Sequence, residues 1–295
     1  MHIPCDGLRI GLDHAEGDLS FLSHAHSDHT SGLSRQKRIL ASPETLELAG
    51  FASEPVACTG AKLLDAGHIL GSRQLLVDGD GIRTAYTGDI SLKPNVFGWK
   101  AEIPQCDRLI MEATYGDPSY VFPPQEEVHG MVSRWVRGND SSNLLIGCYE
   151  LGKAQEMIRI LNREGISPLI SERADAFTSV YNKYGVKLDR VVVGSEEAEE
   201  AMSHRFVAIL PMAKAKRYFA SRLAQAFGRR TLCAVATGWA LHRRFDTDAS
   251  FPLSDHADFN DLVEFVGQSG AKDVEFFCGD GSAVLKARKQ AILNS

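Results

Sequence analysis

Three histidines and an aspartate fall within six residues near the start of the chain, in the run HAHSDH that covers residues 24–29. An apolar stretch, SFLS, precedes the run and predicts a strand that ends there. Alternate side chains of an extended backbone point to one side, so His24 and His26 should face the same way. If the chain then turns, Asp28 and His29 can approach an adjacent position. This spacing of nitrogen and oxygen donors is typical of a zinc-binding loop.

Two later residues extend this donor set. His68 stands in DAGHILGS and Asp89 in YTGDIS, and each directly follows a glycine at the end of an apolar run. In this order after the first run, they are expected to provide a third imidazole and a bridging carboxylate. Asp13 ends another strand-like run, LRIGLD, and is expected to support the loop by hydrogen bonds.

Composition limits the class of protein. The chain has 295 residues, of which 44% are hydrophobic and 24% charged, as in ordinary globular domains. It shows no apolar run of membrane-spanning length and no secretory signal. Its six cysteines are scattered, with no CxxC pair, which favours reduced thiols and a cytoplasmic location.

Basic residues gather in one window of an otherwise acidic chain. The formal net charge is −6, yet residues 214–245 contain no Asp or Glu. The window's cations are Lys214, Lys216, Arg217, Arg222, Arg229, Arg230, Arg243 and Arg244. Such a segment is either a solvated surface or a track for a polyanion.

The pattern of elements changes along the chain. Short strand-like runs separated by turns dominate the first hundred residues, whereas strands alternate with helices after about Pro123. A helix, a strand and a helix end the sequence. We therefore expect an α/β insertion at residues 122–245 within a discontinuous outer domain, residues 1–121 and 246–295.

The motifs together resemble a known superfamily. HAHSDH, AGHILGS and TGDIS resemble the successive metal motifs of the metallo-β-lactamase superfamily. MEATYGD, CYELGKAQE and PLSDHADF resemble its β-CASP branch, which processes nucleic acids. Over nearly the whole chain the sequence is most similar to the DNA-ligase-associated exonucleases, also called mRNA 3'-end processing factor-like. The resemblance implies an α/β class protein, a four-layered αββα fold with an inserted α/β β-CASP domain.

The resemblance also implies a two-zinc centre. One zinc ion would be bound by His24, His26, His68 and Asp89. The second would be bound by Asp28, His29 and the shared Asp89. Glu112 matches the acidic β-CASP motif, and His256 matches the histidine that this acid orients over the scissile phosphate.

One position departs from the family pattern. Relatives carry a His-Gly pair after the last core strand, and that histidine completes the second zinc site. Here Cys278 and Gly279 stand at that place. Cys278 can bind zinc as a thiolate or be a small apolar residue. If Cys278 is only a small apolar residue, the second metal ion is bound more weakly, and Mn²⁺ can replace Zn²⁺ there.

The resemblance implies a zinc-dependent nuclease that hydrolyses phosphodiester bonds with a zinc-bridging hydroxide, most favourably a DNA exonuclease in repair. Asp28 would orient the attacking water or accept its proton, and His256 would protonate the leaving oxygen. Lys153 at a helix start, with Arg243 and Arg244, would bind phosphates. No ligase or helicase domain is visible, so a DNA ligase or other repair or processing protein is an expected partner.

Other functions remain open at this level. An RNA-processing endo- or exonuclease of the cleavage-factor type uses the same architecture, although DNA is the favoured substrate. A small-molecule metallohydrolase fits the first hundred residues but does not need the basic insertion. A catalytically silent binding subunit is the third alternative. Lys153 can also be an exposed lysine of an ordinary turn. Ser254 and Asp255 are expected to cap the helix that follows His256, or else to shape the site.

Overall fold

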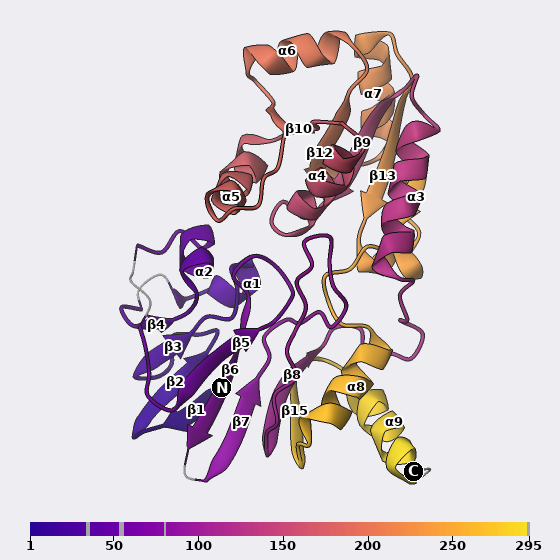
Figure 1. Cartoon of the computed structure of the whole chain (residues 1–295). Helices are drawn as coiled ribbons and strands as arrows, with labels where there is room; N and C mark the ends of the chain where they lie inside the picture. Colours follow the sequence, from indigo (N-terminus) through magenta and orange to yellow (C-terminus); the bar gives the residue numbers. More distant parts are fainter. Residues whose placement is uncertain (34–35, 53–55, 80, 294–295) are drawn as a thin grey trace. The chain divides into compact units, whose positions relative to one another are not determined.

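A computed structural model describes residues 1–33, 36–52, 56–79 and 81–293. The chain divides into two compact units (Figure 1). The first comprises Met1–Val121 and Asp255–Ser295, and the second comprises Phe122–Ser254.

The first unit contains two sheets. One has the order β1-β2-β3-β4, and the other has the order β15-β8-β7-β6-β5. The strands of the first sheet are β1 (His2–Cys5), β2 (Leu8–Leu12), β3 (Leu19–Phe21) and β4 (Ile39–Leu40). Those of the second are β5 (Ala61–Asp65), β6 (Arg73–Gly79), β7 (Ile82–Tyr86), β8 (Arg108–Ala113) and β15 (Asp273–Gly279). The helices of this unit are α1 (Ser27–Thr30), α2 (Pro43–Leu48), α8 (Phe259–Ser269) and α9 (Ser282–Leu293).

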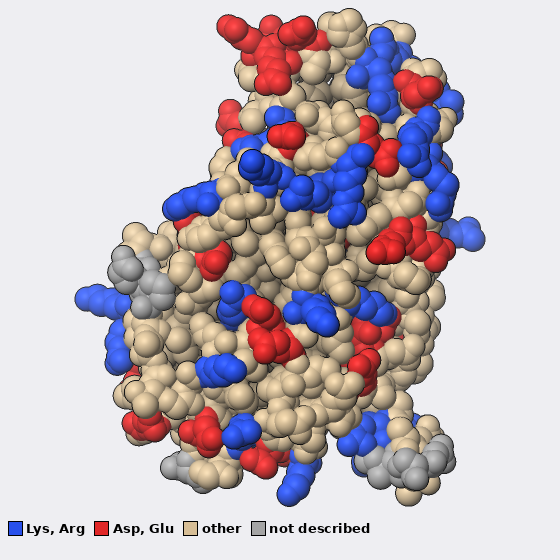
Figure 2. All heavy atoms as spheres, viewed as in Figure 1, with Lys and Arg blue, Asp and Glu red and all other residues tan. Residues whose placement is uncertain are grey.

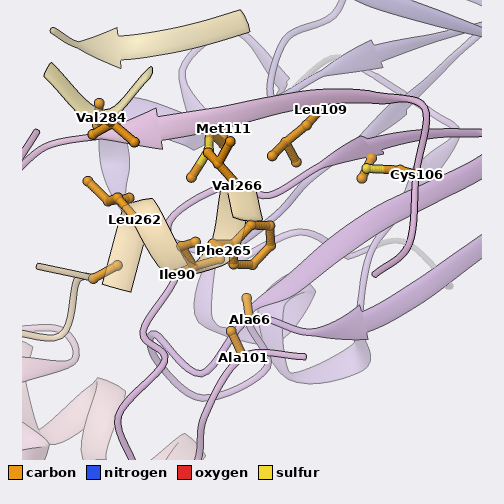
Figure 3. Packing of buried hydrophobic residues seen from close by; sticks show 13 residues of the cluster. Ala66, Ile90, Ala101, Cys106, Leu109, Met111, Leu262, Phe265, Val266 and Val284 are labelled. Carbon is orange, nitrogen blue, oxygen red and sulfur yellow. The ribbon is translucent and has the colours of Figure 1, made fainter. Parts of the chain in front are cut away.

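These elements form four layers, with the two sheets in the middle and helices on their outer faces. The alternation of side chains along each strand places apolar residues on both faces of a sheet. In β8, Ile110 packs between the two sheets, whereas Leu109 and Met111 point to the opposite face. On that face Leu262 and Phe265 of α8 cover the second sheet (Figure 3). A separate cluster joins the outer face of the first sheet to α2 through Leu22, Leu33, Ile39, Ala41 and Leu46. The predicted αββα fold is confirmed.

The second unit is built on one sheet of order β11-β10-β12-β9-β13-β14, whose pairings are all parallel. Its strands are β9 (Asn143–Cys148), β10 (Leu169–Ile170), β11 (Val191–Val192), β12 (Val207–Pro211), β13 (Thr231–Ala236) and β14 (Ala249–Phe251). Its helices are α3 (Gln125–Arg137), α4 (Lys153–Arg163), α5 (Glu172–Lys183), α6 (Glu196–Ser203), α7 (Arg217–Phe227) and the short η2 (Met212–Lys214) and η3 (Gly238–Leu241). This is the alternating α/β pattern expected for the insertion.

The boundary at the end of the insertion needs a correction. The second unit continues beyond the predicted end at Phe245 as far as Ser254. The reason is β14, which pairs with β13 through Ala249–Ala234 and Phe251–Ala236 and so belongs to the same sheet. A three-residue edge strand gives too short a pattern to be recognised in the sequence.

Among the described residues, no helix combines the length and the apolar character that crossing a bilayer would require.

Candidate metal centre

The HAHSDH segment lies directly after β3. The strand ends at Phe21, His24 and His26 follow in irregular backbone, and α1 begins at Ser27. The Nε2 atom of His24 lies 3.1 Å from Nδ1 of His26, and that Nδ1 atom lies 3.1 Å from Nε2 of His68. Three imidazole nitrogens therefore converge, although His68 comes from the loop between β5 and β6.

Asp89 completes this group from the loop after β7. Its Oδ2 atom lies 3.5 Å from Nε2 of His24 and 3.7 Å from Nε2 of His68. The glycine before it, Gly88, has a positive φ of 54°, and a Cβ atom there would lie 2.5 Å from Cβ of Ser23. The loop can thus approach the histidine segment only because residue 88 lacks a side chain.

The four donors fit one divalent cation. One ligand atom from each of His24, His26, His68 and Asp89 lies within 4.8 Å of the other three. Zinc with bonds of about 2.0–2.1 Å needs tetrahedral donors roughly 3.3 Å apart, which is close to these separations. Burial lowers the pKa of His24 and of His68, so both imidazoles are neutral and have a lone pair for a metal.

Hydrogen bonds on the outer side of the rings orient the donors. The Nδ1 atom of His68 lies 2.8 Å from the carbonyl oxygen of Asp255, which leaves its Nε2 atom facing the cluster. No local sequence pattern predicts this contact, because 187 residues separate the partners. The expectation that Ser254 and Asp255 cap the next helix was wrong, since Asp258 is the N-cap of α8 and accepts from the N–H of Asp261.

Asp28 and His29 lie beside this group and share Asp89 with it. Nε2 of His29 is 3.6 Å from Oδ2 of Asp89 and 3.8 Å from Oδ2 of Asp28. Asp28 has a side chain that is 79% exposed. Burial alone would lower the pKa of His29, but its hydrogen bond to Asp13 and the charge of Asp89 raise it to about 9. Among the described residues, neither Asp28 nor His29 belongs to a group of three convergent donors. The donors of this second set therefore lie farther apart than those of the first.

Cys278 lies on β15 opposite Glu112 on β8. Its Sγ atom forms a convergent group with one oxygen each of Asp89 and Glu112, all within 4.8 Å of one another. Burial, followed by the charge of Glu112, raises the pKa of the thiol to about 12. Cys278 is therefore close enough to bind a cation that Asp89 also binds. Its thiol would lose its proton at neutral pH only when such a cation is bound.

Glu112 and His256 form a buried pair next to Asp89. Nδ1 of His256 lies 2.9 Å from Oε2 of Glu112, whose Oε1 accepts from the N–H of Ile90 at 2.7 Å. Nε2 of His256 faces Asp89 at 3.9 Å. Burial lowers the pKa of His256, but the charges of Glu112 and Asp89 outweigh burial and raise it to about 10. The imidazole ring of His256 packs edge-on against Tyr115. Its orientation is therefore set by the hydrogen bond to Glu112 at the end of β8 and by the ring of Tyr115.

The predicted phosphate-binding residues lie in the second unit. Lys153 is buried, with 1% of its surface exposed, and its Nζ atom lies 3.0 Å from Oε2 of Glu156. The N–H of Gly152 donates to Gln155, so it is not open to a phosphate. Arg243 and Arg244 are exposed, and the guanidinium group of Arg243 stacks over the ring of Trp239 at 4.5 Å. The arginines are accessible to a polyanion, whereas the lysine is paired inside the unit.

No protein-family model matches the sequence, but curated relatives do. The chain is 33% identical over 270 residues to a probable DNA ligase of Opitutus terrae, covering 84% of this chain and 25% of that protein. It is 26% identical to an RNase J-like protein of Methanocaldococcus jannaschii, over 52% of this chain and 38% of that protein. It is 25% identical to the 5' exonuclease Apollo of Gallus gallus, over 84% of this chain and 56% of that protein.

A crystal structure of a protein of unknown function from Enterococcus faecalis superposes with a TM-score of 0.60 and 13% identity, over 88% of this chain and 74% of that one. That likeness concerns the fold. The chain spans between a quarter and just over half of the length of the three curated relatives.

The layered fold and its histidine–aspartate site define a protein of the metallo-β-lactamase superfamily. Within it, the chain belongs to the β-CASP branch and matches the DNA-ligase-associated group, which confirms the predicted membership. The family implies binding of a divalent metal, for which the His24, His26, His68 and Asp89 group is the candidate.

Proposed function

We propose that this chain is a metal-dependent nuclease that hydrolyses phosphodiester bonds, with DNA as the favoured substrate. One observation carries the proposal: the Asp89 carboxylate lies among the imidazoles of His24, His29, His68 and His256, at 3.5 to 3.9 Å from each. Relatives named as a 5' exonuclease and an RNase J-like protein support the same reaction class.

In this proposal His24, His26, His68 and Asp89 bind one Zn²⁺, and Asp28, His29 and Asp89 bind a second, with Cys278 as a further donor. Mn²⁺ is the alternative at the second position if Cys278 does not bind, because three donors then remain and one of them, Asp28, is exposed. Bound cations of this kind lower the pKa of a water molecule and offset negative charge on a phosphoryl group.

His256 is the proposed proton donor to the leaving oxygen. Glu112 binds its Nδ1 atom at 2.9 Å, and its Nε2 atom points toward Asp89 at 3.9 Å, which is the side of the proposed metal centre. The raised pKa of His256 keeps that nitrogen protonated at neutral pH. Asp28, whose carboxylate is exposed beside His29, is the proposed acceptor for the proton of the attacking water.

Substrate binding outside the centre is assigned to the basic window of residues 214–245. Part of its charge is already neutralised within the unit, since Arg217 pairs with Asp248 at 3.3 Å. Arg243 and Arg244 are exposed, and Arg243 lies over Trp239, an aromatic side chain of the kind on which bases stack. Figure 2 shows acidic side chains gathered at α6 and basic side chains, interspersed with acidic ones, over the rest of the viewed face of this unit.

A DNA ligase is the proposed partner, because one relative is named as a probable DNA ligase and extends well beyond the matched segment. An RNA substrate is the second candidate, favoured by the RNase J-like relative. A cytoplasmic location belongs to the same proposal, on the six free thiols.

The test uses DNA and RNA strands of matched sequence, single- and double-stranded and labelled at either end, with Zn²⁺ or Mn²⁺. We expect release of products from one end of DNA, lost after chelation and in His256→Ala. Hydrolysis of a thioester, lactone or lactam without cleavage of any polymer would assign the site to small molecules. A cation-loaded chain that binds strands without cutting them would be a binding subunit.

A further inference from the structure

Two cysteines far apart in the sequence meet in the first unit. The Sγ atoms of Cys5 and Cys58 lie 3.6 Å apart, although 53 residues separate them. Both thiols also lie near the carbonyl oxygen of Thr59, at 3.2 and 3.5 Å. Cys5 is the last residue of β1 and is 1% exposed, whereas Cys58 is partly exposed and lies outside regular secondary structure.

We propose that Cys5 and Cys58 are a site of reversible oxidation, at which a peroxide converts the two thiols into a disulfide. The sulfur atoms must move from 3.6 Å to a bond of about 2.05 Å. Cys58 can supply this movement because its backbone belongs to no strand or helix, while β1 stays paired with β2.

The partly exposed Cys58 reacts first, and its sulfur is oxidised to a sulfenic acid as the peroxide is reduced to water or an alcohol. The sulfur of Cys5 then attacks the sulfenic sulfur. The S–O bond breaks, the S–S bond forms, and the proton of Cys5 leaves with the hydroxyl group as water. Burial raises the pKa of Cys5 to about 12, with a further contribution from its hydrogen bond to Cys58, so Cys5 is not the thiol that a peroxide oxidises first.

The position of the pair determines what the bond would do. Cys5 belongs to the first sheet, whereas Cys58 precedes β5 of the second sheet, and both pack in the core between the sheets. Cys5 pairs with Leu8 at the start of β2, whose other end leads to Asp13. The strand after Cys58, β5, begins at Ala61 and leads toward His68. The disulfide would therefore link the two sheets at the ends of β2 and β5 that lie away from the metal centre.

The experiment treats the full chain with hydrogen peroxide at increasing concentrations and follows its intact mass and disulfide-linked peptides. We expect the loss of two hydrogen atoms, reversed by dithiothreitol, and one linked peptide pair that contains Cys5 and Cys58. The midpoint of thermal unfolding should rise by roughly 5–10 °C, because closing a long loop restricts the unfolded chain. Cation content measured by mass spectrometry should not change.

Cys58→Ser is the main variant, because a partly exposed side chain tolerates serine, and it should abolish both effects. Cys106→Ala is the matched control and should retain them, since Cys106 lies on the other face of the second sheet. Addition of oxygen to Cys58 without a cross-link would overturn the proposal, as would a disulfide between other cysteines or a cross-link that leaves the unfolding midpoint unchanged.

Discussion

The Oδ2 atom of Asp13 lies 2.7 Å from Nδ1 of His29. The same carboxylate accepts hydrogen bonds from the backbone N–H and the hydroxyl group of Ser23 and from the hydroxyl group of Tyr86. Asp13 itself has a φ of 55°, which is unusual for a residue other than glycine. One strained residue at the end of β2 thus positions the segment that carries the proposed zinc donors.

Asp13→Ala should therefore weaken binding of the second cation by about 10–100-fold, the usual effect of losing a partner that orients a ligand. Calorimetric titration of the metal-free chain with Zn²⁺ measures the change. Tyr86→Phe is the control, because it removes one of these hydrogen bonds and leaves His29 held. Equal affinities in Asp13→Ala and the wild type would show that His29 needs no support.

Asp89→Asn and Asp28→Asn make the same chemical change at two very different positions. Asp89 is buried among four imidazoles, whereas Asp28 is 79% exposed and lies 3.8 Å from His29. We expect Asp89→Asn to remove tight binding of both cations and Asp28→Asn to affect only the weaker one. Metal content after dialysis decides this, and equal losses in the two variants would contradict the shared role of Asp89.

His256→Ala should lower turnover by roughly 10²–10⁴-fold, the usual contribution of a positioned acid. Bound metal should stay at the wild-type level, because His68, His24 and His26 remain. Steady-state cleavage of labelled DNA and metal analysis of the same sample provide both readouts. A variant that loses metal together with activity would make His256 a ligand.

Lys153→Ala should destabilise the second unit by about 3–5 kcal/mol, since it removes the ammonium group from the buried carboxylate of Glu156 and leaves that carboxylate with His129 at 3.6 Å. Urea unfolding measures the loss. Lys187→Ala removes an exposed lysine of the same unit and should change stability little. If Lys153→Ala instead keeps its stability and binds DNA more weakly, the lysine contacts phosphate as the sequence suggested.

Replacement of Arg243 and Arg244 by alanine should weaken DNA binding and reduce the slope of log K against log salt by about one for each phosphate that the chain no longer binds. Fluorescence anisotropy at several salt concentrations gives that slope. Arg137→Ala, which removes an exposed arginine paired with Glu164, serves as the control. An unchanged slope in the double variant would exclude these arginines from the substrate path.

Much of the fold followed from local patterns. The period of apolar residues distinguished the strand-rich first segment from the alternating insertion, and the glycines around His68 and Asp89 marked loops at strand ends. The insertion's end was misplaced because β14 has only three residues and is recognisable only by its pairing with β13. The strand before His24 ends at Phe21, but His26 keeps an extended backbone, and the side chains of His24 and His26 meet as expected.

The amino-acid sequence by itself determined the donor types, their order and the family, because these depend on residue identity and short spacings. Tertiary structure alone decided which atoms meet: His68 with the carbonyl of Asp255, Cys278 with Glu112, and Lys153 with Glu156 in the interior. The first two contacts join strands or loops more than a hundred residues apart, and the burial of Lys153 depends on how α4 packs. Burial and long-range pairing are properties of the folded chain, which no local pattern encodes.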